Sequence, residues 1–204
     1  MQYIFIHGLG QTALSWDKTI SFLKNSVQYN CPNLSGLIAD KDVTYQNLYT
    51  AFSAYCNDIP EPLCLCGLSL GGMLALNYTL DNPEKVKSLI LIGTQYKIPK
   101  GLFKFQNLIF NILPKSAFKG MGFDKPDILR LTKSMIELDF SAELTKISCD
   151  TLIICGAKDK ANFKAAKGLS ERILTAKLKI IENAAHEVNK DNPEELAKII
   201  NDRK

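Results

Sequence analysis

Residues 67–72, Gly67-Leu68-Ser69-Leu70-Gly71-Gly72, separate an apolar run over Leu63–Cys66 from a helical pattern over Leu70–Leu80. A strand that turns at once into a helix around a serine holds that serine in a strained backbone conformation. The residues two before and two after the serine must be nearly free of side chain, because strand and helix cross closely there. We therefore expect the Ser69 hydroxyl at the carboxyl edge of a sheet, beside the positive end of a helix.

This Gly-x-Ser-x-Gly pattern resembles the nucleophile elbow of the α/β-hydrolase family, and of its serine carboxylesterases and thioesterases in particular. Only two histidines occur, His7 and His186, and both lie where the resemblance requires one. The resemblance implies an α/β fold with a doubly wound, mostly parallel sheet of about six strands and a short helical lid. The family usually begins with an antiparallel hairpin, whereas here the first predicted strand follows Met1. We therefore expect that hairpin to be missing and the sheet to be all parallel.

Short apolar runs alternate with amphipathic stretches along the chain, which is typical of a parallel sheet covered by helices on both faces. The predicted strands are Tyr3–Ile6, Val27–Cys31, Leu63–Cys66, Ser88–Ile92, Thr151–Cys155 and Lys177–Ile181. The predicted helices are Ala13–Lys24, Thr44–Asn57, Leu70–Leu80, Phe163–Arg172 and Pro193–Asn201. Ligand groups are then expected at the carboxyl ends of the strands.

Residues 96–142 interrupt this alternation. Two stretches there have apolar residues at helical spacing, namely Leu102, Phe105, Ile109 and Ile112, then Ile128, Leu131, Met135 and Leu138. The position, between the fourth and fifth strands, is where the family inserts its cap. We therefore expect an α/β core over residues 1–95 and 143–204 and a helical lid over residues 96–142.

The resemblance also implies a catalytic triad. A serine hydroxyl becomes a good nucleophile only when a neighbouring base takes its proton. His186 follows the last predicted strand and resembles the family's histidine. Asp159 follows the strand Thr151–Cys155, where the family has its acid, whereas Asp150 precedes that strand and would lie at the opposite edge. The implied triad is Ser69 as nucleophile, His186 as base and Asp159 as the acid that orients it.

Two backbone amides complete the implied site as an oxyanion hole. The amide of Leu70 directly follows the nucleophile. His7-Gly8-Leu9-Gly10 resembles the family's His-Gly loop, in which the residue after His-Gly donates the second amide, here Leu9. We expect His7 to shape the loop and not to act as a base. Gln11 either points its amide into the pocket or lies in solvent.

The lid suggests the substrate. Its apolar faces favour a pocket for an acyl or alkyl group, with candidate lining residues Leu9, Leu70, Phe105, Ile109, Met135 and Val188. The lid is also rich in lysine, at Lys97, Lys100, Lys104, Lys115 and Lys119. Such a charge run is usually a solvated face, and the alternative is a surface for an anionic partner such as an acyl carrier protein, a coenzyme A thioester or an acidic lipid.

The leading hypothesis is a serine hydrolase that cleaves a carboxylic ester or thioester of a small, largely apolar acyl substrate through an acyl-enzyme. The same triad also serves carbon–carbon bond hydrolases and lyases, and a ligand-binding receptor of this fold stays open as a non-catalytic alternative. Dehalogenases and epoxide hydrolases of the family have an aspartate where this chain has Ser69.

The composition excludes other classes. With 204 residues, of which 46% are hydrophobic, the chain is suited to one domain. The net charge is +4, but few of the 25 basic residues are arginine, so we expect no nucleic-acid partner. Six cysteines without a C-x-x-C pair and two histidines predict neither a metal site nor a cofactor. Reduced cysteines and the absence of a leader or an apolar run of ~20 residues favour a cytoplasmic protein without a membrane span.

Overall fold

A six-stranded sheet forms the centre of the protein. The structure is a computed structural model that describes residues 1–38, 41–101 and 109–203. The strand order is β2-β1-β3-β4-β5-β6 and every neighbouring pair is parallel, as the sequence predicted. The strands are β1 Gln2–Ile6, β2 Tyr29–Asn30, β3 Leu63–Leu68, β4 Val86–Ile92, β5 Asp150–Gly156 and β6 Ala176–Ile181.

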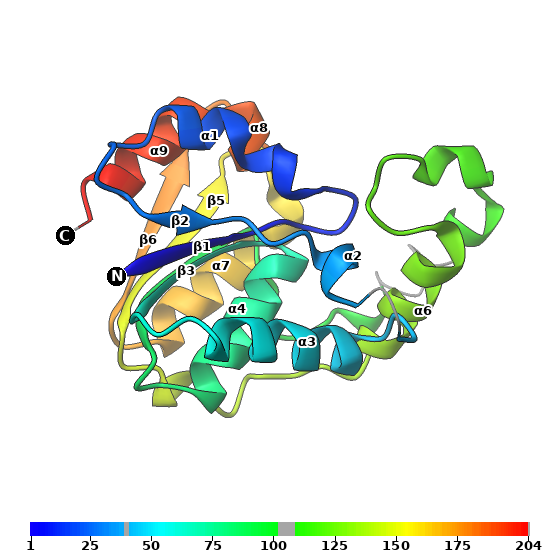
Figure 1. Ribbon diagram of the computed structural model, residues 1–204, viewed down its shortest axis with the longest axis horizontal. Coiled ribbons are helices and arrows are strands. Elements are labelled where there is room, and N and C mark those ends of the chain that lie inside the picture. Colours follow the sequence, from blue (N-terminus) through cyan, green and yellow to red (C-terminus); the bar gives the residue numbers. More distant parts are fainter. Residues whose placement is uncertain (39–40, 102–108, 204) are drawn as a thin grey trace.

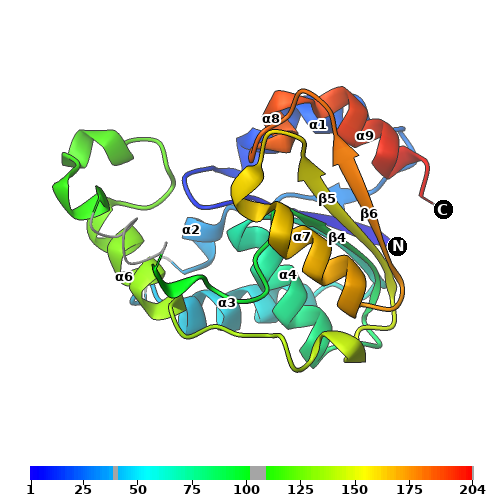
Figure 2. The same cartoon turned by 180° about the vertical axis from the view of Figure 1, so that it is seen from behind.

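Helices cover both faces of the sheet, which makes the fold doubly wound as predicted (Figures 1 and 2). One face carries η1 Ala13–Trp16, α1 Asp17–Ser21, α8 Val188–Asp191 and α9 Pro193–Asn201. The other face carries α3 Tyr45–Asn57, α4 Leu70–Asp81 and α7 Lys160–Arg172, and α2 Leu34–Leu37 lies near the carboxyl end of β1. Among the described residues, every helix is too short or too polar to cross a lipid bilayer.

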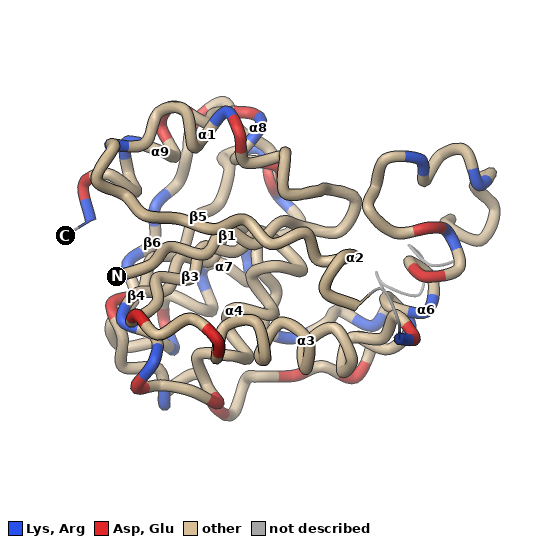
Figure 3. The backbone as a smooth tube through the Cα atoms, viewed as in Figure 1, with Lys and Arg blue, Asp and Glu red and all other residues tan. Residues whose placement is uncertain are grey.

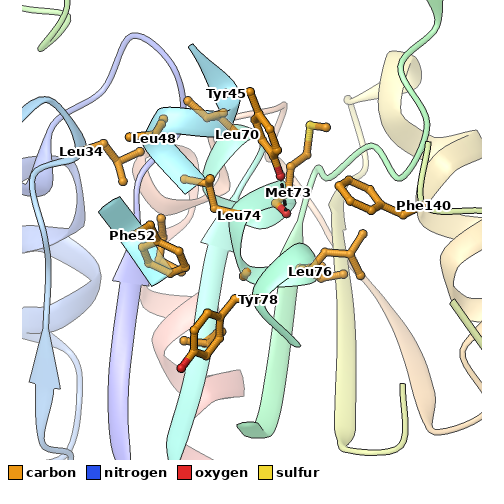
Figure 4. Packing of buried hydrophobic residues seen from close by; sticks show 14 of the residues in the cluster. Leu34, Tyr45, Leu48, Phe52, Leu70, Met73, Leu74, Leu76, Tyr78 and Phe140 are labelled. Carbon is orange, nitrogen blue, oxygen red and sulfur yellow. Dashed lines mark hydrogen bonds between the residues drawn. The ribbon is translucent and has the colours of Figure 1, made fainter. Parts of the chain in front are cut away.

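The central strands are buried on both faces, because each face packs against its own helix layer. All six residues of β3 are buried, and alternate residues enter different clusters: Leu65 joins the cluster with α3 and α4, whereas Cys66 joins the cluster with Trp16. Figure 4 shows α3 packed on α4, where the Tyr45 hydroxyl donates to the Met73 carbonyl at 3.2 Å. This packing fixes α4, the helix that begins at the serine elbow.

Between β4 and β5, the part of the described chain around α6 projects from the carboxyl side of the sheet (Figure 1). The described elements between these strands are η2 Lys115–Phe118, α6 Lys125–Met135 and η3 Leu144–Lys146. Helix α6 is capped by Asp124, whose side chain accepts a hydrogen bond from the amide of Asp127. Its residues Ile128, Leu131 and Met135 are buried against the α3–α4 cluster, so this helix forms part of the core as well as an insertion.

The predicted helix at the start of this segment lies mostly outside the described residues, including Phe105. Of its predicted inward face, Ile109 and Ile112 are 41% and 77% exposed. Phe110 packs instead against Phe118, with ring centroids 5.8 Å apart. The inward direction is therefore offset by one residue from the predicted one, because the aromatic contact of Phe110 decides which side faces the protein.

Candidate active site

The serine elbow has the geometry that its sequence predicts. Ser69 lies between β3 and α4 with φ 53° and ψ −111°, a conformation that costs a non-glycine residue about 1–3 kcal/mol. A Cβ on Gly67 would lie 2.3 Å from the carbonyl oxygen of Gly71. A Cβ on Gly71 would lie 2.2 Å from the carbonyl oxygen of Ile6. Glycine is required at both positions because strand, helix and the end of β1 approach so closely.

Asp159 and His186 form a hydrogen-bonded pair at the same edge of the sheet. Asp159 follows β5 and His186 follows β6, and the distance from Nδ1 of His186 to Oδ2 of Asp159 is 2.9 Å. Burial raises the pKa of the Asp159 carboxyl, but hydrogen bonds from His186 and Asn162 outweigh it and hold that pKa below its ordinary value. The carboxyl is therefore ionised and can only accept, so Nδ1 of His186 carries the ring proton. Nε2 is then the acceptor nitrogen.

Ser69 and His186 line the same cavity, which has a volume of about 310 Å³. Within the described part of the chain, the Ser69 hydroxyl and the His186 ring form no direct hydrogen bond with each other. Such contacts are often long without substrate and shorten when it binds. The cavity therefore brings together the hydroxyl of a half-buried serine and an imidazole whose acceptor nitrogen is not used elsewhere in the described part of the chain.

The loop after β1 lies beside Ser69. A Cβ on Gly8 would be only 3.6 Å from the Cβ of Ser69, and Leu9, Gly10 and Leu70 line the cavity together with the serine. Leu9 and Leu70, whose amides are predicted as the oxyanion hole, thus belong to two segments that border the cavity together with Ser69. Their role as donors stays a prediction.

His7 is buried, and both nitrogens of its ring form hydrogen bonds with the backbone. Its Nδ1 donates to the carbonyl of Gly8 at 2.9 Å, and its Nε2 accepts from the amide of Leu34 at 3.1 Å. Burial lowers the pKa of His7, so the neutral ring is favoured. Both ring nitrogens are occupied, which fits the expectation that His7 shapes the loop.

Gln11 is buried and does not line the cavity. Its side chain donates to Glu187 at 2.7 Å and accepts from Asn189 at 3.2 Å. These bonds connect the loop after β1 with the loop that carries His186. Neither alternative considered from the sequence, a pocket residue or a solvated one, describes this position, because its partners come from the other end of the chain.

The predicted substrate-binding residues have different locations. Met135 lines the cavity, and Phe105 lies outside the described residues. Ile109 is exposed, and Val188 is fully buried in the cluster with Trp16 and Leu196. The prediction that Val188 faces the cavity was wrong. The residue begins α8, and this helix packs on the face of the sheet that carries Trp16, away from α3 and α4.

The lysine-rich segment is partly neutralised. Lys97 pairs with Asp139 at 2.7 Å, and Lys100 pairs with Glu137. Lys115 and Lys119 are exposed, and Lys104 lies outside the described residues. Basic and acidic positions are interspersed along the backbone of the described chain (Figure 3). An anionic partner at this segment stays a hypothesis, with fewer unpaired charges than the sequence suggested.

Three residues beside the His–Asp pair were not assigned a role from the sequence. Asn162 donates from Nδ2 to both Asp159 oxygens, at 2.8 and 2.9 Å. Gln95 donates to the side-chain oxygen of Asn162 at 2.7 Å. Gly93, with φ 53°, lies where a Cβ would be 2.9 Å from Nδ1 of His186. The sequence feature that could have indicated Asn162 is its distance from Asp159. Asn162 lies three residues after this aspartate, which caps α7.

A doubly wound parallel sheet with a strained serine at one strand–helix turn, and a His–Asp pair at the same edge, defines an α/β protein with a serine-centred site. The chain belongs to the alpha/beta hydrolase family, whose family model matches residues 3–199. The resemblance inferred from the elbow and the histidine loop is thereby confirmed.

Several proteins named as esterases are similar in sequence to this chain. The chain is 27% identical over 165 residues to the pimeloyl-[acyl-carrier protein] methyl ester esterase of Pseudoalteromonas atlantica, covering 72% of this chain and 64% of the relative. It is 23% identical over 238 residues to the protein of that name from Aeromonas hydrophila, covering 97% and 92%. Two further relatives of the same name are matched over only 36% and 35% of their own length.

Solved structures agree on the fold. MenH from S. aureus superimposes with a TM-score of 0.83 at 18% identity, covering 98% of this chain and 91% of that one. The enol-lactonase from Burkholderia xenovorans superimposes with a TM-score of 0.85 at 15% identity, covering 98% and 89%. At these identities the likeness shows the shared fold alone.

Proposed function

We propose that this protein is a serine hydrolase that cleaves a carboxylic ester or thioester of a small, uncharged acyl group through an acyl-enzyme. The chief support is that Ser69 and His186 line one cavity while Asp159 accepts from the far nitrogen of the His186 ring. Relatives named as esterases support the same class of reaction.

In the proposed reaction, Nε2 of His186 takes the proton of the Ser69 hydroxyl as the serine oxygen attacks the substrate carbonyl carbon. The carbonyl oxygen becomes an oxyanion, which accepts from the amides of Leu9 and Leu70. The imidazolium, stabilised by Asp159, then gives its proton to the departing alcohol or thiol. Water attacks the acyl-enzyme in the same way, so that the acid leaves and Ser69 regains its proton.

The cavity favours a neutral acyl group. Among the described residues that line it, none is aspartate, glutamate, lysine or arginine. Its walls are mainly apolar, contributed by Met73, Ile98, Phe110, Phe118, Met121, Ile128 and Met135. Burying a charge there without a partner would be costly. A volume near 310 Å³ is at the lower end for small-molecule sites, which favours short acyl groups.

The proposal is tested by labelling the folded protein with a fluorophosphonate probe. We expect stoichiometric labelling that is abolished in Ser69→Ala and retained in Ser170→Ala, a matched serine-to-alanine change near the carboxyl end of α7. Activity on p-nitrophenyl esters of increasing acyl length should follow the same pattern and be highest for short chains. A folded wild-type protein that stays unlabelled and hydrolyses no ester or thioester would refute the proposal and favour a receptor.

A further inference from the structure

Asp159 is held by a second side chain besides His186. Its Oδ1 accepts from the backbone amide of Asn162 at 3.2 Å, as the cap of α7. The side-chain nitrogen of Asn162 lies between both carboxylate oxygens, at 2.8 and 2.9 Å. The carboxylate is therefore fixed in rotation as well as in place, with Oδ2 directed at the His186 ring.

The orientation of the Asn162 amide is determined by its neighbours. An ionised carboxylate only accepts, so Asn162 must present its NH₂ group to Asp159 and its oxygen away from it. The oxygen is where Gln95 donates, at 2.7 Å. The NH₂ group also lies 3.1 Å from Nδ1 of His186, but both nitrogens are donors there, so this is a contact and not a hydrogen bond.

We propose that Asn162 is a positioning residue that holds the Asp159 carboxylate toward His186, and that Gln95 fixes the orientation of the Asn162 amide. The inference deepens the proposed function and rests on it for its effect on rate. Gln95 follows β4 and Asn162 belongs to α7, so the pair joins two elements at the carboxyl edge of the sheet. Without Asn162, the carboxylate can rotate away from the ring, and the imidazolium loses its partner.

The decisive variant is Gln95→Glu. A carboxylate at position 95 accepts from Asn162 where glutamine donated, which favours a flipped amide with its oxygen facing Asp159. We expect kcat to fall by about tenfold to a hundredfold, as we also expect for Asn162→Leu. The loss of a hydrogen bond to a charged group typically changes a rate or an equilibrium by about this factor. Gln95→Met is the matched control, because methionine removes the Gln95 donor without offering Asn162 a competing acceptor, and its loss should be several-fold smaller.

A double variant separates the flip from the added charge. If Gln95→Glu acts through Asn162, it should add little further loss in an Asn162→Leu background. An equal loss in both backgrounds would mean that the charge acts directly on the cavity, and this would overturn the proposal. So would an Asn162→Leu variant with unchanged kcat.

Nuclear magnetic resonance of the ring protons gives a readout that needs no turnover. The chain has only two histidines, and the Nδ1 proton of His7, bonded to Gly8, is an internal reference. We expect the Nδ1 proton of His186 to exchange faster or shift in Asn162→Leu and Gln95→Glu, and to persist in Gln95→Met. This pattern in an inactive wild-type protein would refute the proposed function and keep the inference. An unchanged His186 signal in all variants would overturn the inference even if the protein is an active esterase.

Discussion

Replacing Gly93 with alanine should reduce catalysis more than stability. The added Cβ would lie 2.9 Å from Nδ1 and 3.0 Å from Cε1 of His186, and 3.3 Å from Oδ2 of Asp159. Ordinary contact begins near 3.4 Å, so the ring must move by about 0.5 Å (3.4 minus 2.9). Catalytic groups must be held within about 0.5 Å of their productive positions, so this shift reaches that limit, and a misplacement of 1 Å can cost about 10²-fold in rate. We expect kcat to fall about tenfold to a hundredfold, with KM little changed.

The positive φ of 53° at Gly93 adds backbone strain of about 1–2 kcal/mol for any other residue. This corresponds to a loss of about 2–8 °C in Tm for a chain of this length. Gly120→Ala is the matched control, because Gly120 has φ 78° and open space around its Cβ position. It should show a similar loss of Tm with normal ester hydrolysis. Equal kcat values for the two variants would contradict the argument from contact with the His–Asp pair.

Two further predictions concern the proposed triad. His186→Ala should lower hydrolysis of a p-nitrophenyl ester by about 10⁴-fold, because triad members act as a unit; an activity close to wild type would require another base. For Asp159, hydrogen bonds that outweigh burial hold the pKa in the folded protein below its ordinary value. The ionised carboxylate therefore stabilises the fold above about pH 4. This contribution is lost as the pH falls through the pKa of the folded state. The difference in Tm between wild type and Asp159→Asn, followed by circular dichroism, should therefore shrink below about pH 4. A constant difference down to pH 2 would contradict that reasoning.

The centre of the sheet could be predicted well because its central strands β3, β4 and β5 are buried on both faces. Runs such as Leu89–Ile92 are apolar without alternation, and that pattern has few other interpretations in an α/β chain. The predicted strand Val27–Cys31 was too long, since only Tyr29–Asn30 pairs with β1 and both residues are exposed. The predicted helix Ala13–Lys24 is a 3-10 turn followed by a helix that ends at Ser21. Both differences lie at an edge of the fold, where packing decides the length of an element.

The site could be predicted only as far as single positions carry a local signature. Ser69 has one in its flanking glycines, and Asp159 and His186 follow strands that were easy to recognise. Asn162 was missed because α7 was expected to begin at Phe163, whereas it begins at Lys160 with Asp159 as its cap. An earlier start would have put Asn162 on the first turn beside Asp159. The division into core and lid stays a prediction, since α6 contributes to both.

The two histidines show how one residue type takes different roles at one edge of a sheet. In each ring, Nδ1 donates to an oxygen, the Gly8 carbonyl for His7 and the Asp159 carboxylate for His186. The difference is the other nitrogen. Nε2 of His7 accepts from the Leu34 amide, and the residue is buried. In contrast, Nε2 of His186 accepts no hydrogen bond from the described residues, and its ring lines the cavity. Only His186 therefore has an acceptor left for the proton of Ser69, and its charged partner makes the resulting imidazolium stable where a carbonyl would not.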